Sequence, residues 1–269
     1  MSKVRRYNLF GGGFQHTISS TLDKDPKFIS WDYNVFSNEE TFYVDKSIQQ
    51  GLLDKKSKVK YGWILESKYI VDLESFCYKN LQILKKEFKF IFTHNRFLIS
   101  LDPELFVFTP ANGTWISNPK IYDKTKKISM ITSNKTITQA QKFRIAYANR
   151  NKNSVDLFGR GFKEIPNKEL GLQEYMFSVC IENGIYETYY TEKILDCFAC
   201  GTVPIYLGSP DISDYFNPDG IIVLNKNLDL NLLTESLYYD KIDAIKENLE
   251  KVKKDYYTVE DYIYERFLK

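Results

Sequence analysis

The chain has 269 residues, of which 43% are hydrophobic and 27% are charged, and its formal net charge is +2. This composition excludes a disordered chain and a nucleic-acid binder that relies on a bulk positive field. Aromatic residues reach 16%, which predicts large cores and pockets that stack flat ligands. Only seven of the 37 basic residues are Arg, so an Arg in a suggestive position carries weight.

The N-terminal half reads as short strands and loops with one longer helix. Apolar runs predict strands at 4–10, 28–31, 41–44, 61–65, 88–92 and 106–108. Apolar residues at helical spacing predict a helix over 72–86. A polar, turn-rich stretch at 118–127 predicts a boundary, which gives domains 1–122 and 123–254 and a terminal helix at 255–269.

The C-terminal half alternates strands with helices. Strands are predicted at 128–132, 155–158, 175–181, 202–207 and 221–224, and helices at 138–149, 192–200, 233–254 and 257–269. Nearly continuous apolar strands that alternate with helices indicate an α/β fold with a parallel sheet covered on both faces. Ligands of such sheets bind beyond the carboxyl ends of the strands, so candidate site residues follow the strands directly.

The segment 175–220 carries the most chemistry. Its first strand delivers Glu182 and Asn183 to the carboxyl edge, and Thr191 then caps the helix that begins with Glu192 and Lys193. The free N–H groups of a helix start and a Lys suit a phosphate, while a carboxylate accepts hydrogen bonds from vicinal sugar hydroxyls. Cys197 and Cys200 form a CxxC without a second pair, which favours two small buried residues over a metal or redox site.

Four elements of this segment resemble the donor-binding region of glycosyltransferase family 10, the α1,3/α1,4-fucosyltransferases, and most of all the bacterial-type members. They are 181–184 (IENG), 190–193 (YTEK), 202–205 (TVPI) and 208–210 (GSP). The resemblance implies a GT-B fold of two Rossmann-like domains, with an interdomain cleft and a C-terminal helix that crosses back over the domains. It also implies an inverting transfer from a GDP-sugar donor.

The resemblance assigns roles on the donor side residue by residue. Lys193 matches the phosphate-contacting Lys, and Glu192 matches the Glu that supports the donor sugar or ribose and the developing positive charge. Asn183 and Tyr189 match donor-pocket positions, beside Glu182. Arg144, which precedes the sequence VDLFG at 155–159, matches the Arg that binds the pyrophosphate.

On the acceptor side the resemblance implies a general base after a short strand. Glu66 is the candidate, although Lys68 replaces the Pro of the family pattern; a surface Glu is the alternative, and Asp72 and Glu74 are nearby competitors. His16 and His94 follow apolar strands and could act as a base or bind acceptor hydroxyls. The triglycine at 11–13, with Gly12 at its centre, could cradle a ligand or form only a tight turn.

The sequence therefore predicts a glycosyltransferase, with L-fucose from GDP-fucose as the leading donor and a glycan hydroxyl as acceptor. A glycosyltransferase that uses another GDP-sugar, such as a heptose or mannose, and a non-catalytic glycan- or nucleotide-binding protein remain alternatives. No cofactor is predicted, and no metal, since no Asp-x-Asp motif ends a strand. With no predicted signal peptide or membrane span and only four Cys, we expect a soluble, cytoplasmic protein of bacterial or viral origin, with peripheral membrane contact through the terminal helix as an option.

Overall fold

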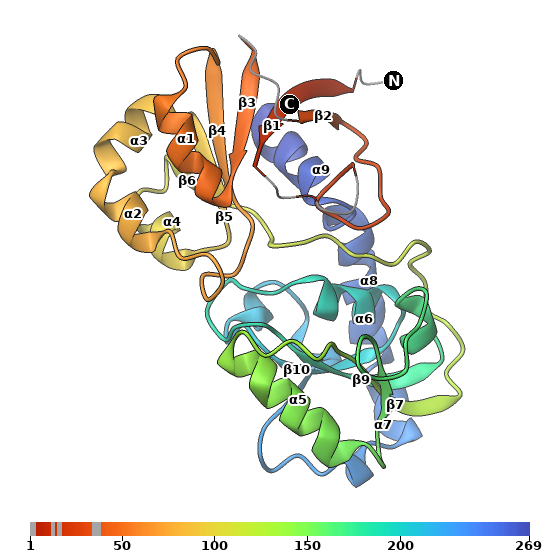
Figure 1. Cartoon of the computed structure of the whole chain (residues 1–269). Coiled ribbons are helices and arrows are strands. Elements are labelled where there is room, and N and C mark those ends of the chain that lie inside the picture. The colour runs from red at the N-terminus through yellow and green to blue at the C-terminus, as the bar shows by residue number, and fades with distance from the viewer. Residues whose placement is uncertain (1–3, 12–13, 15–17, 34–38) are drawn as a thin grey trace. The chain divides into compact units, whose positions relative to one another are not determined.

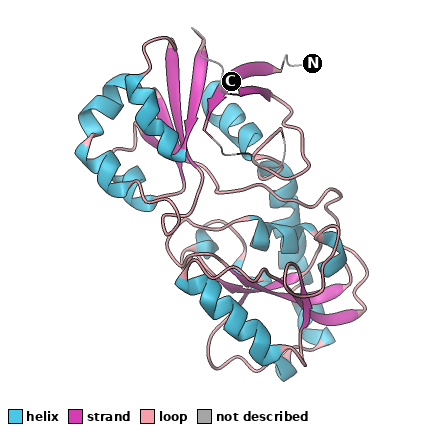
Figure 2. Ribbon diagram, in the orientation of Figure 1, coloured by secondary structure: helices cyan, strands magenta, loops and turns pink. Residues whose placement is uncertain are grey.

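The computed structural model describes the chain except for residues 1–3, 12–13, 15–17 and 34–38. The chain divides into two compact units, the first made of Met1–Gly113 and Tyr257–Lys269 and the second of Thr114–Tyr256. The sequence placed the corresponding boundaries at 122/123 and 254/255. Each unit is built on one parallel sheet flanked by helices (Figures 1 and 2).

The first unit contains a six-stranded sheet in the order β2-β1-β3-β4-β5-β6. Its strands are β1 (Arg5–Phe10), β2 (Ile29–Tyr33), β3 (Glu40–Val44), β4 (Val59–Ile64), β5 (Phe90–Thr93) and β6 (Phe106–Phe108). Its helices are α1 (Ile48–Leu53), α2 (Glu74–Lys79), α3 (Leu81–Glu87), α4 (Arg96–Leu101) and α9 (Val259–Ile263), the last continued by a π-helical turn at Tyr264–Leu268. The strand order reverses between β1 and β3. Ligands of such sheets bind beyond the carboxyl ends of the two strands where the order reverses.

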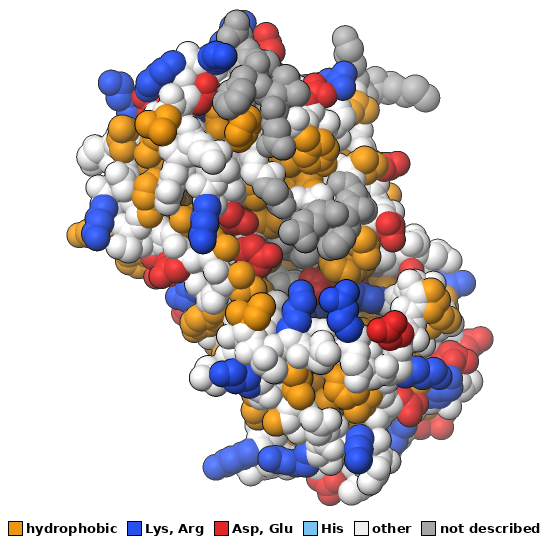
Figure 3. All heavy atoms as spheres, viewed as in Figure 1, with side chains coloured by type: hydrophobic (Ala, Val, Ile, Leu, Met, Phe, Trp, Pro, Cys, Tyr) orange, Lys and Arg blue, Asp and Glu red, His pale blue; other side chains and the backbone are white. Residues whose placement is uncertain are grey.

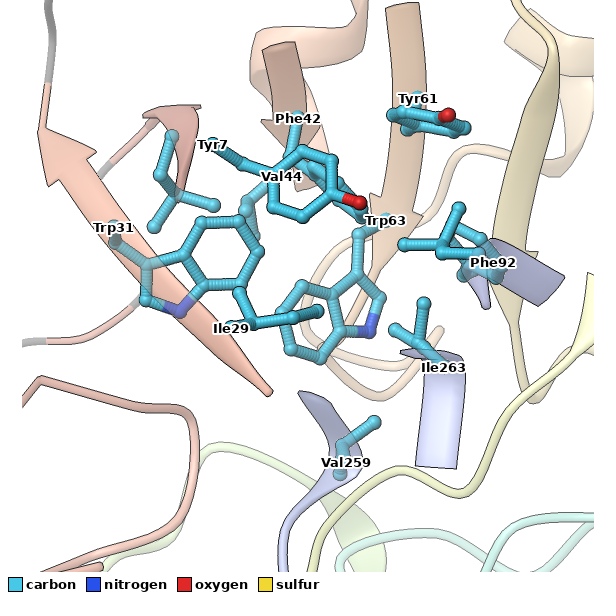
Figure 4. Packing of buried hydrophobic residues seen from close by; sticks show 12 residues of the cluster. Tyr7, Ile29, Trp31, Phe42, Val44, Tyr61, Trp63, Phe92, Val259 and Ile263 are labelled. Atoms are coloured by element: carbon cyan, nitrogen blue, oxygen red, sulfur yellow. The ribbon is translucent and has the colours of Figure 1, made fainter. Parts of the chain in front are cut away.

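Aromatic side chains fill one face of this sheet. Trp31 packs edge-on against Phe42 with ring centroids 5.1 Å apart, and Phe42 stacks on Phe92 at 5.8 Å. Val259 and Ile263 of α9 belong to the same buried cluster (Figure 4). The C-terminal segment therefore completes the core of the first unit, and much of the aromatic excess of the sequence lies in this core.

The other face of the same sheet is covered by helices α1 to α4. Alternate strand residues point to it, so that Tyr43 packs here while its neighbour Phe42 packs on the aromatic face. The helices contribute Ile48, Leu84 and Leu98, each almost fully buried.

The second unit contains a five-stranded parallel sheet in the order β11-β10-β9-β7-β8. Its strands are β7 (Lys126–Ile131), β8 (Asp156–Phe158), β9 (Tyr175–Ile181), β10 (Val203–Leu207) and β11 (Ile222–Val223). Its helices are α5 (Gln139–Asn151), α6 (Glu192–Ala199), α7 (Glu235–Asp240) and α8 (Ile242–Asp255). The order reverses between β7 and β9, so the carboxyl ends of these two strands mark the expected ligand edge.

The chain enters and leaves the second unit at neighbouring positions. The backbone N–H of Thr114, its first residue, donates to the carbonyl oxygen of Tyr256, its last, at 2.9 Å. The second unit is thus one continuous segment with adjacent ends, whereas the first is assembled from two separated segments.

Two long helices predicted from the sequence are each broken. The helix predicted over 72–86 is two helices separated at Asn80, whose side-chain amide donates to the carbonyl oxygen of Phe76 at 2.8 Å. Such side-chain bonding to the backbone competes with helix continuation. The helix predicted over 233–254 is interrupted at Lys241 between α7 and α8.

The surface carries charges of both signs, as the nearly equal numbers of acidic and basic residues indicate. On the face shown in Figure 3, acidic and basic side chains are interspersed over each unit. Among the described residues, the helices are all too short or too polar to cross a membrane.

Candidate active site

The carboxyl end of β9 is the centre of the candidate site. The helix α5 begins close by, with Thr138 as its N-cap: the Thr138 hydroxyl donates to the carbonyl oxygen of Asn183 at 2.8 Å and accepts from the N–H of Gln141. This capping box ties the start of α5 to the end of β9. The helix therefore presents its next turn to the edge where the strand order reverses.

Arg144 lies on that next turn of α5 and is 5% exposed. Its Nη1 donates to the carbonyl oxygen of Ile181 and to Oδ1 of Asn183, both at 3.1 Å. Its Nε is buried and has no hydrogen-bond partner in the described part of the chain. Burial lowers the pKa of Arg144, and the charges of Glu182 and Glu192 oppose that effect.

The partners of Arg144 are neutral, which is unusual for a buried cation. Among the described residues, no carboxylate lies within ion-pair distance of its guanidinium. Because buried charges are normally paired, this arrangement is typical of a site that receives an anion. A guanidinium suits the adjacent oxygens of a phosphate through parallel hydrogen bonds.

Lys193 lies in the first turn of α6, the helix that follows β9. Its Nζ contacts Oγ1 of Thr191 at 2.8 Å, Oε2 of Glu182 at 3.2 Å and Oε1 of Glu192 at 3.3 Å. Burial lowers the pKa of Lys193, but the carboxylates of Glu182 and Glu192 outweigh burial and raise it. The charge of Arg144 also acts on Lys193, so the two cations share one electrostatic environment.

Glu182 is fully buried, and its carboxylate binds Thr191 at the start of α6. Its Oε1 accepts from the backbone N–H of Thr191 at 2.9 Å, and its Oε2 accepts from the Thr191 hydroxyl at 2.8 Å. It therefore holds the start of α6 against the end of β9. Glu182 thus positions Thr191 and Lys193 and is fully buried, and its contact with the donor stays a prediction.

Glu192 is held between two cations. Its Oε1 lies 3.3 Å from Nζ of Lys193 and 3.4 Å from Nζ of Lys168. Burial alone would raise the pKa of Glu192, but the two lysines hold it well below its usual range, so the side chain is ionised. Its side chain keeps 13% of its surface exposed.

Lys168 and Asp196 were missed by the sequence interpretation. Lys168 Nζ lies 2.8 Å from Oδ2 of Asp196, which is 1% exposed, and 3.9 Å from the ring centroid of Trp115. Asp196 also accepts from the hydroxyl of Thr114 at 2.8 Å and from the N–H of Trp115 at 2.7 Å. No local signal identifies Lys168, because it stands in an irregular stretch before β9 and reaches Glu192 only through the tertiary fold.

Tyr189 is buried and stacks on Tyr186, with ring centroids 4.6 Å apart and an angle of 12° between the planes. The turn before it is fixed by the N–H of Thr188, which donates to both carboxylate oxygens of Asp211. Tyr186 is the more exposed ring of the pair. Tyr186 therefore presents the accessible aromatic ring of this pair, although the sequence interpretation selected Tyr189.

The acceptor-side candidates lie in the first unit. Glu66 follows β4 and is exposed, while Asp72 is exposed and Glu74 is bound by Lys68 at 3.2 Å and by Asn95 at 2.8 Å. Gly12 and His16 lie outside the described residues.

His94 is buried in the first unit, and its predicted role toward an acceptor stays a prediction. The ring is 1% exposed, and its Nε2 lies 3.3 Å from the carbonyl oxygen of Leu65. Burial lowers the pKa of His94 to about 4, so the ring is neutral near pH 7. It supports the backbone next to Glu66.

The cysteines are free and buried, as the sequence indicated for the CxxC. The Sγ atoms of Cys180 and Cys197 lie 3.2 Å apart in the interior, with Cys200 close in sequence.

Comparison with known proteins gives a family. A model of the glycosyltransferase family 10 (fucosyltransferase) C-terminal region matches residues 121–263, more than half of the chain. An α-(1,3)-fucosyltransferase of Helicobacter pylori is 40% identical over 67 residues, which cover 24% of this chain and 14% of that protein. The 4-galactosyl-N-acetylglucosaminide 3-α-L-fucosyltransferase 9 of Mus musculus is 31% identical over 109 residues, which cover 38% of this chain and 29% of that protein. The matched segments thus span less than a third of these relatives.

Among solved structures, an α1,3-fucosyltransferase crystallised with GDP-fucose is similar in fold, with a TM-score of 0.55 and 16% identity over 92% of this chain and 83% of that one. A structure of an α1,3-fucosyltransferase with GDP gives a TM-score of 0.53 at 16% identity. The α/β fold of GT-B type that the sequence predicted is confirmed. With the family model matching across the second unit and into α9, the chain belongs to glycosyltransferase family 10.

Proposed function

We propose that this chain is an inverting glycosyltransferase that transfers L-fucose from GDP-fucose to a hydroxyl of a glycan acceptor. The observation that carries the proposal is Arg144, a buried cation with neutral partners at the edge where the second sheet reverses its order. Family membership and the fucosyltransferase names of the relatives support this donor.

In this proposal Arg144 and Lys193 neutralise the charge that builds on the diphosphate of the departing GDP. Lys193 exchanges part of its contact with Glu182 and Glu192 for phosphate oxygens. Glu192, kept ionised by its two lysines, accepts hydrogen bonds from sugar hydroxyls and stabilises the positive charge at the anomeric carbon. The two cations supply the electrostatic role that a metal fills elsewhere, so we propose no metal or other cofactor.

On the acceptor side we propose Glu66 as the general base. Its carboxylate takes the proton of the attacking hydroxyl while the oxygen forms a bond to the anomeric carbon and the bond to GDP breaks. The donor phosphate leaves from the opposite face, which inverts the configuration. The proton passes from Glu66 to solvent after release of the product.

The first experiment measures GDP binding and GDP release. Arg144→Ala removes charge-assisted hydrogen bonds to phosphate, each worth about 1.5–3 kcal/mol, and should weaken GDP binding roughly 10- to 150-fold. Arg150→Ala is the matched control, because Arg150 is an exposed Arg on the same helix. Unchanged GDP affinity and turnover in both Arg144→Ala and Glu192→Ala would refute the donor site.

The second experiment tests the reaction. The wild-type chain is incubated with GDP-fucose and galactose- or GlcNAc-containing acceptors, and Glu66→Gln should lose turnover at least about 100-fold while donor binding persists. A thermal-shift panel of GDP, UDP, ADP and their sugars separates fucose from a heptose or mannose donor. Donor binding without turnover on any acceptor would instead favour a non-catalytic binding protein.

A further inference from the structure

The carboxyl edge of the first sheet holds a second carboxylate beside Glu66. Asp45 is the first residue after β3, and β3 lies next to β1 at the point where the strand order reverses. Its Oδ1 accepts from the backbone N–H of Leu65 at 2.9 Å and of Glu66 at 3.2 Å. These two N–H groups belong to the residues that leave the end of the neighbouring strand, β4.

The same two residues are held from a different direction by His94. Its Nε2 lies 3.3 Å from the carbonyl oxygen of Leu65, which fits the tautomer that carries its proton on Nε2. Two N–H groups and one carbonyl of the segment 65–66 are therefore fixed by side chains from the ends of β3 and β5. The backbone of Glu66 has a defined position although its side chain is exposed.

Asp45 occupies a backbone conformation that favours glycine, with φ at +49°. A non-glycine residue there has a conformational cost, which persists where the surrounding structure or a function maintains it. The hydrogen bonds from the N–H groups of Leu65 and Glu66 to the Asp45 carboxylate stabilise this conformation.

The electrostatics of Asp45 also involve Glu66. Burial raises the pKa of Asp45 to about 6, the two backbone N–H groups lower it, and the charge of Glu66 raises it. Glu66 is the ionisable group that acts on Asp45 in the described part of the chain. The charge of Glu66 therefore favours the protonated form of Asp45.

We propose that Asp45 is a positioning residue for the acceptor-side carboxylate of Glu66: it fixes the backbone from which Glu66 projects and places a second negative charge beside it. The inference rests on the proposed role of Glu66 as the base. Asp45 keeps its Oδ1 on the two N–H groups throughout, and Glu66 alone exchanges the proton with the acceptor.

Two variants separate geometry from charge. Asp45→Asn retains an oxygen that accepts both N–H groups and loses the charge, whereas Asp45→Gly relieves the strained φ and loses both functions. We expect Asp45→Gly to lower kcat about 10- to 100-fold with little change in KM for the donor, since misplacing a reacting group by ~1 Å has an effect of this size. Asp45→Asn should recover most of kcat and should remove from the kcat/KM profile the inflection near pH 6 at which Asp45 titrates.

The matched control is Asp102→Asn, because Oδ1 of Asp102 also accepts from two successive backbone N–H groups, those of Glu104 and Leu105, both at 3.2 Å. It should leave kcat and the pH profile unchanged. Wild-type kcat in Asp45→Gly, or equal losses of kcat in the two Asp45 variants with the inflection near pH 6 retained, would overturn the positioning role. A wild-type chain that binds GDP but transfers no sugar would instead refute the proposed function, and the role of Asp45 with it.

Discussion

The ion pair of Lys168 with Asp196 gives a prediction that depends only on the second unit. Lys168→Met keeps the apolar stem over Trp115 and removes the charge 2.8 Å from a carboxylate that is 1% exposed. Removing one partner of a buried pair costs about 3–5 kcal/mol, because the other charge is left uncompensated. Asp196 keeps its bonds from Thr114 and Trp115, so we expect the lower end, about 3 kcal/mol.

For a domain of roughly 150 residues, about 3 kcal/mol corresponds to a Tm decrease of roughly 6–12 °C. Calorimetry of the full chain at pH 7 measures it. The Tm decrease of Lys168→Met relative to the wild type should be smaller at pH 5. Burial already raises the pKa of Asp196, and loss of the Lys168 charge raises it further. The folded variant therefore binds a proton at a pH where the unfolded chain does not. Stability of the variant therefore increases as the pH falls.

Lys253→Met is the control, since Lys253 pairs with Glu250 at 2.7 Å on the surface, where such pairs contribute about 0–1 kcal/mol. If the two variants melt within about 1 °C of each other at pH 7, the Lys168 pair does not contribute as a buried ion pair and the reasoning fails.

Two further predictions concern single positions. Gly159→Ala should lower the stability of the second unit by at least about 2 kcal/mol, because φ is +103° and a Cβ would collide with the carbonyl oxygen of Thr132; an unchanged Tm would contradict this. Burial raises the pKa of Glu260, which accepts from Ser20 and Trp31, to about 7, so its contribution to stability is complete below its ordinary pKa of 4.5 and is lost as the pH rises through 7. The wild type should lose about 2 kcal/mol more than Glu260→Gln between pH 5 and pH 7.5 in denaturant titrations, and parallel pH dependence of the two proteins would disprove the assignment.

Features that depend on neighbouring residues in the sequence, such as helix caps and buried strands, were predicted from the sequence. Thr191 is the N-cap of α6 as expected, and the continuous apolar run at 175–181 is a buried parallel strand. Arg144 was selected because the family resemblance implies an Arg before the sequence VDLFG, and in the structure it contacts the end of β9. These features depend on residues that are close in sequence or on a motif with fixed spacing.

Tertiary contacts explain what the sequence could not give. Lys168 reaches Glu192 from an irregular segment, so no periodicity marks it. The sequence places Glu182 at the strand end but does not tell whether its side chain points to a ligand or to Thr191. Asp45 reads as an ordinary residue after a strand, because its positive φ and its bonds to the neighbouring strand exist only in the folded chain.

The first unit consists of two segments that are far apart in the sequence, and this affects the order in which the chain can fold during synthesis. Domains generally fold as units while the chain is being made. The second unit is one continuous segment and can close its core once residue 256 has left the ribosome. The first unit must wait for Val259 and Ile263, although most of its strands are made earlier. Its sheet therefore stays without α9 on the aromatic face during translation of the entire second unit, an interval in which exposed Trp and Phe side chains offer a binding surface to chaperones.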